Sequence, residues 1–222
     1  MFGDLLTTLW NNLPAALLLS RAVIVPLSFT VHEVAHALVG TLLGDPTPRE
    51  SGRLTLNPLR HVESLGVITG VLIGVGWSRP TPIRPHRMRL CDPVGGLLTV
   101  LAGPLSNLGL ALAGQAAFDA LALQPTYPWS GWPVPADFLT VLVRFNLTLA
   151  LLNALPLFPL DGYALIRFAL PLRAAAWWER ASGWTTAVLG VALFLMLMLP
   201  PTLLVMVLGP PVRWGIKALL GW

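Results

Sequence analysis

The chain has 222 residues, of which 55% are hydrophobic and only 11% are charged, and its mean hydropathy is +0.72. Soluble domains carry about 25% charged residues, so this composition excludes a soluble globular enzyme and a disordered chain and predicts a polytopic membrane protein. The 14 basic residues outnumber the ten acidic ones, and in a membrane protein we expect this excess charge to face phospholipid headgroups and not a nucleic acid.

The first apolar segment, 13–44, carries ionisable residues that are rare in membrane helices. His32, Glu33 and His36 form the sequence H-E-V-A-H. On a helix the two histidines share a face, so both can bind one zinc ion, and the glutamate beside them can serve as a general base. Such residues are costly inside a membrane helix and are usually functional, so we favour a zinc hydrolase over the alternative of satisfied polar residues in a helix bundle.

A basic region follows at 44–92, interrupted by a short apolar segment at 64–78. This segment has 15 residues, four of them glycine, whereas a membrane crossing takes about 20 residues. Both of its flanks contain several arginines, so we predict a re-entrant element that enters and leaves the membrane on the same side. A true span, which would add a fifth crossing, stays open as the alternative.

Three further spans are predicted from runs with little or no charge, at 93–118, 138–160 and 181–212. Each run is long enough to cross a bilayer as a helix. Together with the first apolar segment they give four predicted crossings.

The arginines predict the orientation of these spans. The loop at 124–137 has no basic residue, whereas the loop at 158–183 contains three arginines. By the positive-inside rule, 44–92 and 158–183 are cytoplasmic and 124–137 lies outside. The sequence therefore predicts an all-α, polytopic membrane helix bundle with about four to five transmembrane helices and a re-entrant element near the zinc site, built as a single membrane-embedded domain over residues 1–222.

A second motif, N-A-L-P-L-F-P-L-D-G at 153–162, ends the 138–160 span. Pro156 and Pro159 interrupt the helix, so Asp161 can turn toward a neighbouring helix. A catalytic zinc ion usually has three protein ligands and one position open to water. Asp161 is therefore the candidate third ligand, and an aspartate that caps the next helix at the membrane interface is the alternative.

The two motifs together resemble the site-2 protease family, whose members are intramembrane zinc metalloproteases. The H-E-V-A-H helix and the N-x-x-P-x-x-x-L-D-G pattern of 153–162 match that family without a departure. The segments 52–61, 76–82 and 102–107 resemble further parts of its short bacterial members. Nothing in the chain resembles the PDZ or CBS modules of other members.

This resemblance implies roles for five residues. His32, His36 and Asp161 are the implied ligands of one zinc ion per chain, and Glu33 is the implied catalytic base. Asn153 is implied near the site, where it either contacts the substrate carbonyl or makes a purely structural hydrogen bond.

The function that the resemblance implies is hydrolysis of peptide bonds in or near transmembrane segments of membrane-protein substrates. The expected partners are those substrates and the lipid bilayer, and no nucleic acid. The expected location is a bacterial inner membrane, with a multi-pass chain and the active site toward the cytoplasm.

Two other functions stay open at this point. A catalytically idle scaffold could bind transmembrane segments, although it would have no need of the base Glu33. A metal or solute transporter could use the same histidines, although the spans at 93–118 and 181–212 offer almost no polar residues to line a path. For His61 we favour a structural or substrate-contact role over metal binding. For Asn107 we favour packing of its helix against the site over a catalytic role.

Overall fold

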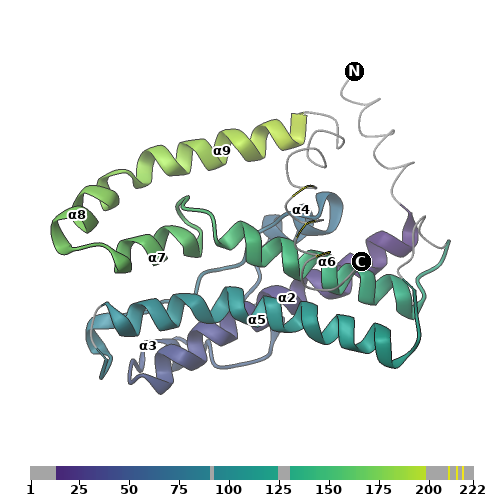
Figure 1. The fold of residues 1–222 in the computed structure, drawn as a ribbon, viewed down its shortest axis with the longest axis horizontal. Coiled ribbons are helices and arrows are strands. Elements are labelled where there is room, and N and C mark those ends of the chain that lie inside the picture. Colours follow the sequence, from purple (N-terminus) through teal and green to yellow (C-terminus); the bar gives the residue numbers. More distant parts are fainter. Residues whose placement is uncertain are drawn as a thin grey trace.

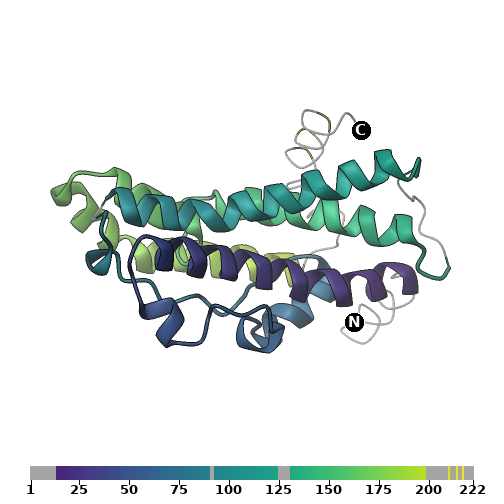
Figure 2. The same cartoon turned by 90° about the horizontal axis from the view of Figure 1, so that it is seen from below.

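The computed structural model describes residues 14–90, 93–124 and 131–198, together with positions 210, 214 and 217. Three long helices dominate this part of the chain: α2 (Ala15–Leu42), α5 (Val94–Ala120) and α6 (Pro135–Asn153). They lie side by side, and α5 runs antiparallel to the other two (Figures 1 and 2). All three are long and apolar enough to cross a membrane.

These helices overlap three of the four predicted spans: α2 lies within 13–44, α5 extends two residues beyond 93–118, and α6 begins three residues before 138–160 and ends seven residues before its end. The fourth predicted span, 181–212, contains α9 (Ser182–Met198), and the greater part of its remainder lies outside the described residues. The all-α prediction is confirmed for the described residues, in which no β-strand is found.

The remaining elements are short. Before α5 come α3 (Thr47–Glu50), η1 (Pro58–Arg60), α4 (Ser64–Ile73) and η2 (Pro85–Arg87), and between α6 and α9 come α7 (Asp161–Ala169) and α8 (Leu172–Arg180). In Figure 2, α3 and α4 lie along one side of α2.

The interface between α2 and α6 is an apolar core. Its buried residues follow helical spacing on both helices and include Leu17, Val25 and Phe29 of α2 and Val141 and Phe145 of α6. The rings of Phe29 and Phe145 meet edge to face, with centroids 5.8 Å apart, an arrangement that aromatic pairs prefer. This packing aligns the two helices along their length.

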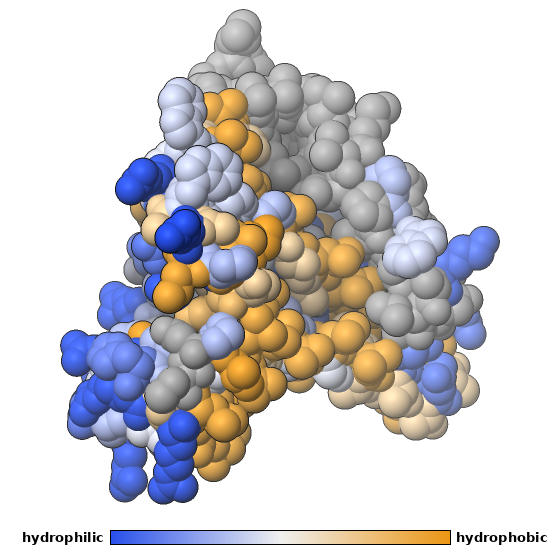
Figure 3. Space-filling model, turned by 60° about the vertical axis from the view of Figure 1, so that its left-hand side comes forward, coloured by the Kyte–Doolittle hydropathy of each residue, from blue (hydrophilic) through white to orange (hydrophobic). Residues whose placement is uncertain are grey.

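The outward faces of α2 and α5 are also apolar. Large side chains that are about half exposed recur along α2 and α5, and they include Leu19, Val23 and Leu27 of α2 and Leu98 and Leu105 of α5. Figure 3 shows hydrophobic residues gathered over the middle of one face, with hydrophilic residues at its margins. A surface of this kind suits contact with lipid tails and not with water.

The two ends of the segment that contains α4 lie next to each other. Val62 and Ser78 form an isolated antiparallel bridge, and the N–H of Arg79 donates to the carbonyl of His61 at 2.7 Å. Between them the chain forms α4 and changes direction at Gly74, whose φ of +80° lies in the left-handed region that favours glycine. The chain therefore leaves this segment close to where it entered.

The chain after α6 turns back onto the bundle. Gly162 lies against the carbonyls of Ala154 and Leu155, where a side chain would overlap them. Further along α7, the ring of Phe168 covers Gly96 of α5. These close contacts hold the first residue of α7, Asp161, near the middle of α2.

Candidate metal centre

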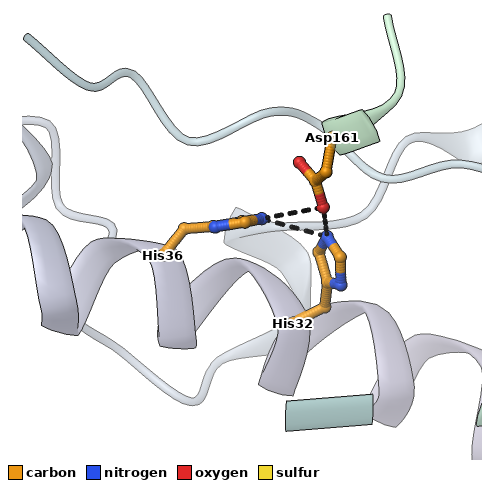
Figure 4. Close-up of side chains that lie close together, drawn as sticks. All are labelled: His32, His36 and Asp161. Atoms are coloured by element: carbon orange, nitrogen blue, oxygen red, sulfur yellow. Dashed lines mark hydrogen bonds and ion pairs between the residues drawn. The ribbon is translucent and has the colours of Figure 1, made fainter. Parts of the chain in front are cut away.

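Three side chains from two distant elements converge inside the bundle (Figure 4). His32 and His36 lie one turn apart on α2, and their Nε2 atoms are 3.1 Å apart. Oδ2 of Asp161 lies 3.2 Å from Nε2 of His32 and 3.4 Å from Nε2 of His36. No other group of three histidine, cysteine or acidic side chains comes together in this way among the residues that the structure describes.

The outer ring nitrogens of both histidines are held by α5. Nδ1 of His36 lies 2.7 Å from the carbonyl of Thr99, and Nδ1 of His32 lies 2.6 Å from Oδ1 of Asn107. A backbone carbonyl only accepts, so Nδ1 of His36 must be the donor, and its Nε2 then carries a lone pair. Both histidines are buried, and each has 5% of its residue surface exposed.

The donor set fits a zinc ion. Oδ2 of Asp161 is buried and has no hydrogen-bond partner among the described residues. Three atoms with lone pairs that face one another repel unless a cation lies between them. Zinc bonds of 2.0–2.1 Å in a tetrahedron imply ligand separations of about 3.3 Å, which is close to the three separations found here.

Comparison with known proteins identifies the family. The chain is 36% identical to the "Putative zinc metalloprotease YwhC" of Bacillus subtilis over 205 residues, which cover 90% of this chain and 87% of that protein. The chain belongs to the site-2 protease family. This is a family of zinc metalloproteases, so the chain is classed as an enzyme of that type.

More distant members of the family align over part of their length. Rip2 of Mycobacterium tuberculosis, also named as a putative zinc metalloprotease, is 32% identical over 142 residues, and Rip2 of Mycolicibacterium smegmatis is 32% identical over 145 residues. Each alignment covers 62% of this chain and 52% of Rip2. No family model and no solved structure matches the chain.

Glu33, the predicted base of this site-2 protease, is buried and held by the segment that follows α4. Its Oε1 accepts the hydroxyl of Ser78 at 2.6 Å, and its Oε2 accepts the backbone N–H of Thr81 at 2.7 Å. The Thr81 hydroxyl also donates to the Glu33 carbonyl at 3.2 Å. Both carboxylate oxygens therefore have fixed partners, and this carboxylate has a defined orientation.

The segment that holds Glu33 is itself fixed by a buried arginine. Nη1 of Arg53 donates to the carbonyl of Arg60 at 2.7 Å and to the carbonyl of Arg79 at 3.0 Å. Burial lowers the pKa of the Arg53 guanidinium below its ordinary value. Arg53 thus ties the two segments on either side of α4 together, next to the partners of Glu33.

Two other candidates make contacts away from the three converging side chains. Asn153 is buried at the end of α6, and its Nδ2 donates to the Leu149 carbonyl of the same helix at 3.0 Å. His61 is fully buried before α4, and its Nε2 lies 2.7 Å from the Thr55 carbonyl. The contact of His61 accounts for a structural role in the loop, and the predicted substrate contact of Asn153 stays a prediction.

Among the residues that support the site, the sequence interpretation named Asn107 as a candidate and missed Ser78, Thr81 and Gly103. Ser78 and Thr81 lie within the segment 76–82, and Gly103 and Asn107 lie within 102–107. Both segments gave a sequence signal, because both resemble parts of the family. That signal did not reveal which atoms these residues contact. A Cβ at Gly103 would lie 2.5 Å from Cε1 of His36 and 2.6 Å from Cε1 of His32, so glycine is needed there for space.

Proposed function

We propose that this protein is an intramembrane zinc endopeptidase that cleaves membrane-protein substrates in or near their transmembrane segments. In this proposal His32, His36 and Asp161 hold one zinc ion per chain, Glu33 is the general base and Asn153 contacts the substrate. The whole of 1–222 acts as one membrane-embedded domain.

One observation carries the proposal. Two imidazole Nε2 atoms of α2 and one carboxylate oxygen of α7 meet at 3.1–3.4 Å, next to α5, and the outward faces of α2 and α5 are apolar. Burying such groups among apolar helices is costly and is retained where function requires it. The hydrogen bonds that point both rings inward support a metal site and not a set of structural contacts.

Each group has a separate role in the proposed reaction. A zinc ion, when bound, supplies a Lewis acid that stabilises negative charge on the scissile carbonyl. Glu33 removes a proton from the attacking water and delivers it to the leaving amine, and such proton transfer contributes about 10²–10⁴-fold to the rate. Ser78 and Thr81 keep the Glu33 carboxylate oriented for this transfer. A substrate helix must unwind locally first, because its own hydrogen bonds cover the carbonyl.

We further propose four crossings with a re-entrant element at 64–78, in a bacterial inner membrane. The bridge between Val62 and Ser78 supports re-entry, because the segment ends where it begins. The ten-residue length of α4 also supports it, since a crossing helix needs about 20 residues. In this topology the arginine-rich 44–92 region is cytoplasmic, and the zinc site opens on that side.

The topology is tested by labelling. Single cysteines on the two flanks of 64–78, introduced in a chain that lacks Cys91, are treated with a membrane-impermeant reagent in sealed vesicles of known orientation. We expect both to be labelled from the cytoplasmic side. Labelling from opposite sides would make this segment a crossing.

The catalytic roles are tested by two variants that separate the base from the ligand. Glu33→Gln keeps the size of the side chain, so zinc should stay bound while turnover falls by about 10²–10⁴-fold. Asp161→Ala removes a ligand, so zinc content and turnover should fall together. Zinc is measured in the purified full chain, and cleavage is followed by comparing membrane-protein fragments in cells with wild-type and variant protein.

The same measurements address the two other functions. A scaffold would leave the fragment pattern unchanged in Glu33→Gln cells. A transporter would give zinc-dependent uptake into vesicles and no fragments. Full zinc content in Asp161→Ala together with loss of zinc in Glu33→Gln would contradict the assigned roles.

A further inference from the structure

A chain of buried hydrogen bonds extends from His32 away from the metal site. Nδ1 of His32 lies 2.6 Å from Oδ1 of Asn107, and Nδ2 of Asn107 donates to Oδ1 of Asn146 at 2.8 Å. Nδ2 of Asn146 in turn donates to the Leu142 carbonyl and to the Ser28 hydroxyl, both at 2.9 Å. Both asparagines and Ser28 are fully buried. These hydrogen bonds connect α2, α5 and α6 at one level of the bundle.

The donor and acceptor roles along this series of hydrogen bonds follow from its last member, Asn146. The carbonyl of Leu142 can only accept, so the atom of Asn146 that faces it must be the amide nitrogen. The oxygen of Asn146 then faces Asn107 and requires the amide nitrogen of Asn107. This leaves the oxygen of Asn107 for His32, whose Nδ1 must therefore be the donor. A flipped Asn107 amide would place its oxygen against the oxygen of Asn146.

This direction determines which nitrogen of His32 can bind a metal. A neutral imidazole has one N–H and one lone pair. With the proton held on Nδ1 by Asn107, the lone pair lies on Nε2, the atom that faces His36 and Asp161. The opposite tautomer would point a proton into the metal site.

His36 receives the same support from the backbone. Its Nδ1 faces the Thr99 carbonyl, which no substitution can remove without moving the helix. Thr99, Gly103 and Asn107 follow one another at intervals of four residues along one face of α5, opposite His36 and His32 of the antiparallel α2. Of the two histidines, only His32 therefore depends on side chains for its orientation.

We propose that Asn107 and Asn146 are positioning residues of the zinc site, with Asn107 orienting the His32 ring and Asn146 fixing the amide of Asn107. The inference rests on the proposed zinc site. Partners of this kind orient the ligand, and their loss typically lowers metal affinity 10–100-fold. Asn146 acts through Asn107 and His32, although it lies on a helix that supplies no ligand.

The test compares a substitution that removes the acceptor with one that keeps it. Asn107→Leu removes the oxygen that faces His32. Asn107→Asp keeps an oxygen there but removes the N–H that Asn146 accepts. Both variants lose the bond between the asparagines, so both should lower the melting temperature of the metal-free full chain in detergent.

Zinc affinity separates the two variants. By competition with a fluorescent zinc chelator, we expect Asn107→Leu to bind zinc about 10–100-fold more weakly than wild type, and Asn107→Asp to stay within about threefold of wild type. Asn146→Leu should weaken zinc binding like Asn107→Leu, but to a smaller extent, because the Asn107 amide nitrogen then keeps only its longer contact with the Ser28 carbonyl, at 3.5 Å. Thr140→Val, which changes another fully buried polar side chain on α6, is the control and should bind zinc as wild type does.

Two results would overturn the inference. The first is zinc affinity of the wild-type level in Asn107→Leu, or in Asn146→Leu if the former does not purify as folded protein. The second is an Asn107→Asp variant that binds zinc as weakly as Asn107→Leu, since the asparagine would then matter for packing alone. Failure of the proposed function is distinct, because the wild-type chain itself would then bind no stoichiometric zinc.

Discussion

The face of α2 that packs against α6 and the face that packs against α5 differ in polarity. Toward α6 the helix presents mainly apolar side chains such as Val25 and Phe29, with the Ser28 hydroxyl as a polar exception. Toward α5 it presents His32 and His36, whose Nδ1 atoms each have a hydrogen-bond partner. In lipid, helices gain little from burying apolar surface against each other, and they associate through close fit and polar contacts. The apolar face therefore supplies shape, whereas the polar face supplies directed bonds and holds the site. A substitution on the apolar face should therefore alter stability alone, whereas a substitution on the polar face should alter metal binding.

The largest effect is expected on the polar face, at Gly103. In Gly103→Ala the new Cβ overlaps both imidazole rings, and overpacking of a buried site costs about 1–3 kcal/mol. Because the overlap falls on two of the proposed ligands at once, the zinc affinity of the purified chain should fall by more than about 100-fold.

Gly109→Ala is the matched control for this prediction. Gly109 lies on the same helix. Apart from its chain neighbours and the backbone of its own helix, no described atom lies within 4 Å of the point that an added methyl carbon would occupy, so zinc binding should not change in this variant. Equal zinc affinity in the two alanine variants would show that the close approach of α5 to the histidines is not needed.

The apolar face is tested at Phe145. Phe145→Ala removes the ring that packs on Phe29, and such truncations cost about 3–5 kcal/mol in a core transferred from water. In lipid the transfer contribution is smaller, so we expect a loss of about 2–3 kcal/mol in unfolding free energy. Zinc content of the folded fraction should stay at the wild-type value.

Leu27→Ala gives the comparison for Phe145. Leu27 lies on α2 but is 44% exposed on the outward face, so its truncation should cost much less. If Phe145→Ala lost zinc while its fold persisted, the separation between the two faces of α2 would not hold.

A smaller effect is expected where the segment 76–82 meets the polar face. Ser78→Ala removes one of the two hydrogen bonds that orient the Glu33 carboxylate, and one such bond to a charged group is worth about 1.5–3 kcal/mol. Because the Thr81 N–H remains, we expect kcat to fall by about tenfold while zinc affinity is unchanged. A kcat above the wild-type value would mean that Ser78 restrains the base.

The smallest effect is expected at Asp45, outside both faces. Its buried carboxylate accepts the N–H of Thr47 at 2.9 Å and the N–H of Arg84 at 2.6 Å. Burial alone would raise the pKa of this carboxyl, but the hydrogen bonds from Thr47 and Arg84 hold it below its ordinary value. Asp45→Asn should therefore cost about 1 kcal/mol of stability at neutral pH.

The pH dependence of the stability that Asp45→Asn loses follows from the direction in which the pKa of Asp45 is shifted. A lowered pKa stabilises the folded state above the ordinary pKa of the carboxyl, and this stabilisation is lost as the pH falls through the lowered value. The difference in melting temperature between wild type and Asp45→Asn should therefore be nearly constant above about pH 5 and shrink between about pH 5 and about pH 2. A difference that stays constant over this range would contradict the assigned hydrogen bonds.

Local features of the sequence predicted the parts of this protein that depend on local geometry. Apolar runs of the length of a bilayer predicted the three long helices, because a helix rises a constant 1.5 Å per residue. The spacing of His32 and His36 predicted a shared face, because residues four apart on a helix are neighbours wherever the helix lies. Pro156 and Pro159 likewise predicted the end of α6, since proline cannot continue the hydrogen-bond ladder.

Contacts between helices were decided by the tertiary structure alone. Asp161 reaches the histidines because Gly162 allows a tight turn and α7 packs on α5 through Gly96. The partners of the ring nitrogens, Thr99 and Asn107, depend on the antiparallel register of α5 against α2. Such a register results from many weak packing contacts along the whole interface, and no short stretch of sequence encodes it. For the same reason the sequence predicted Glu33 as a base, but the contacts of its carboxylate with Ser78 and Thr81 emerged only from the folded chain.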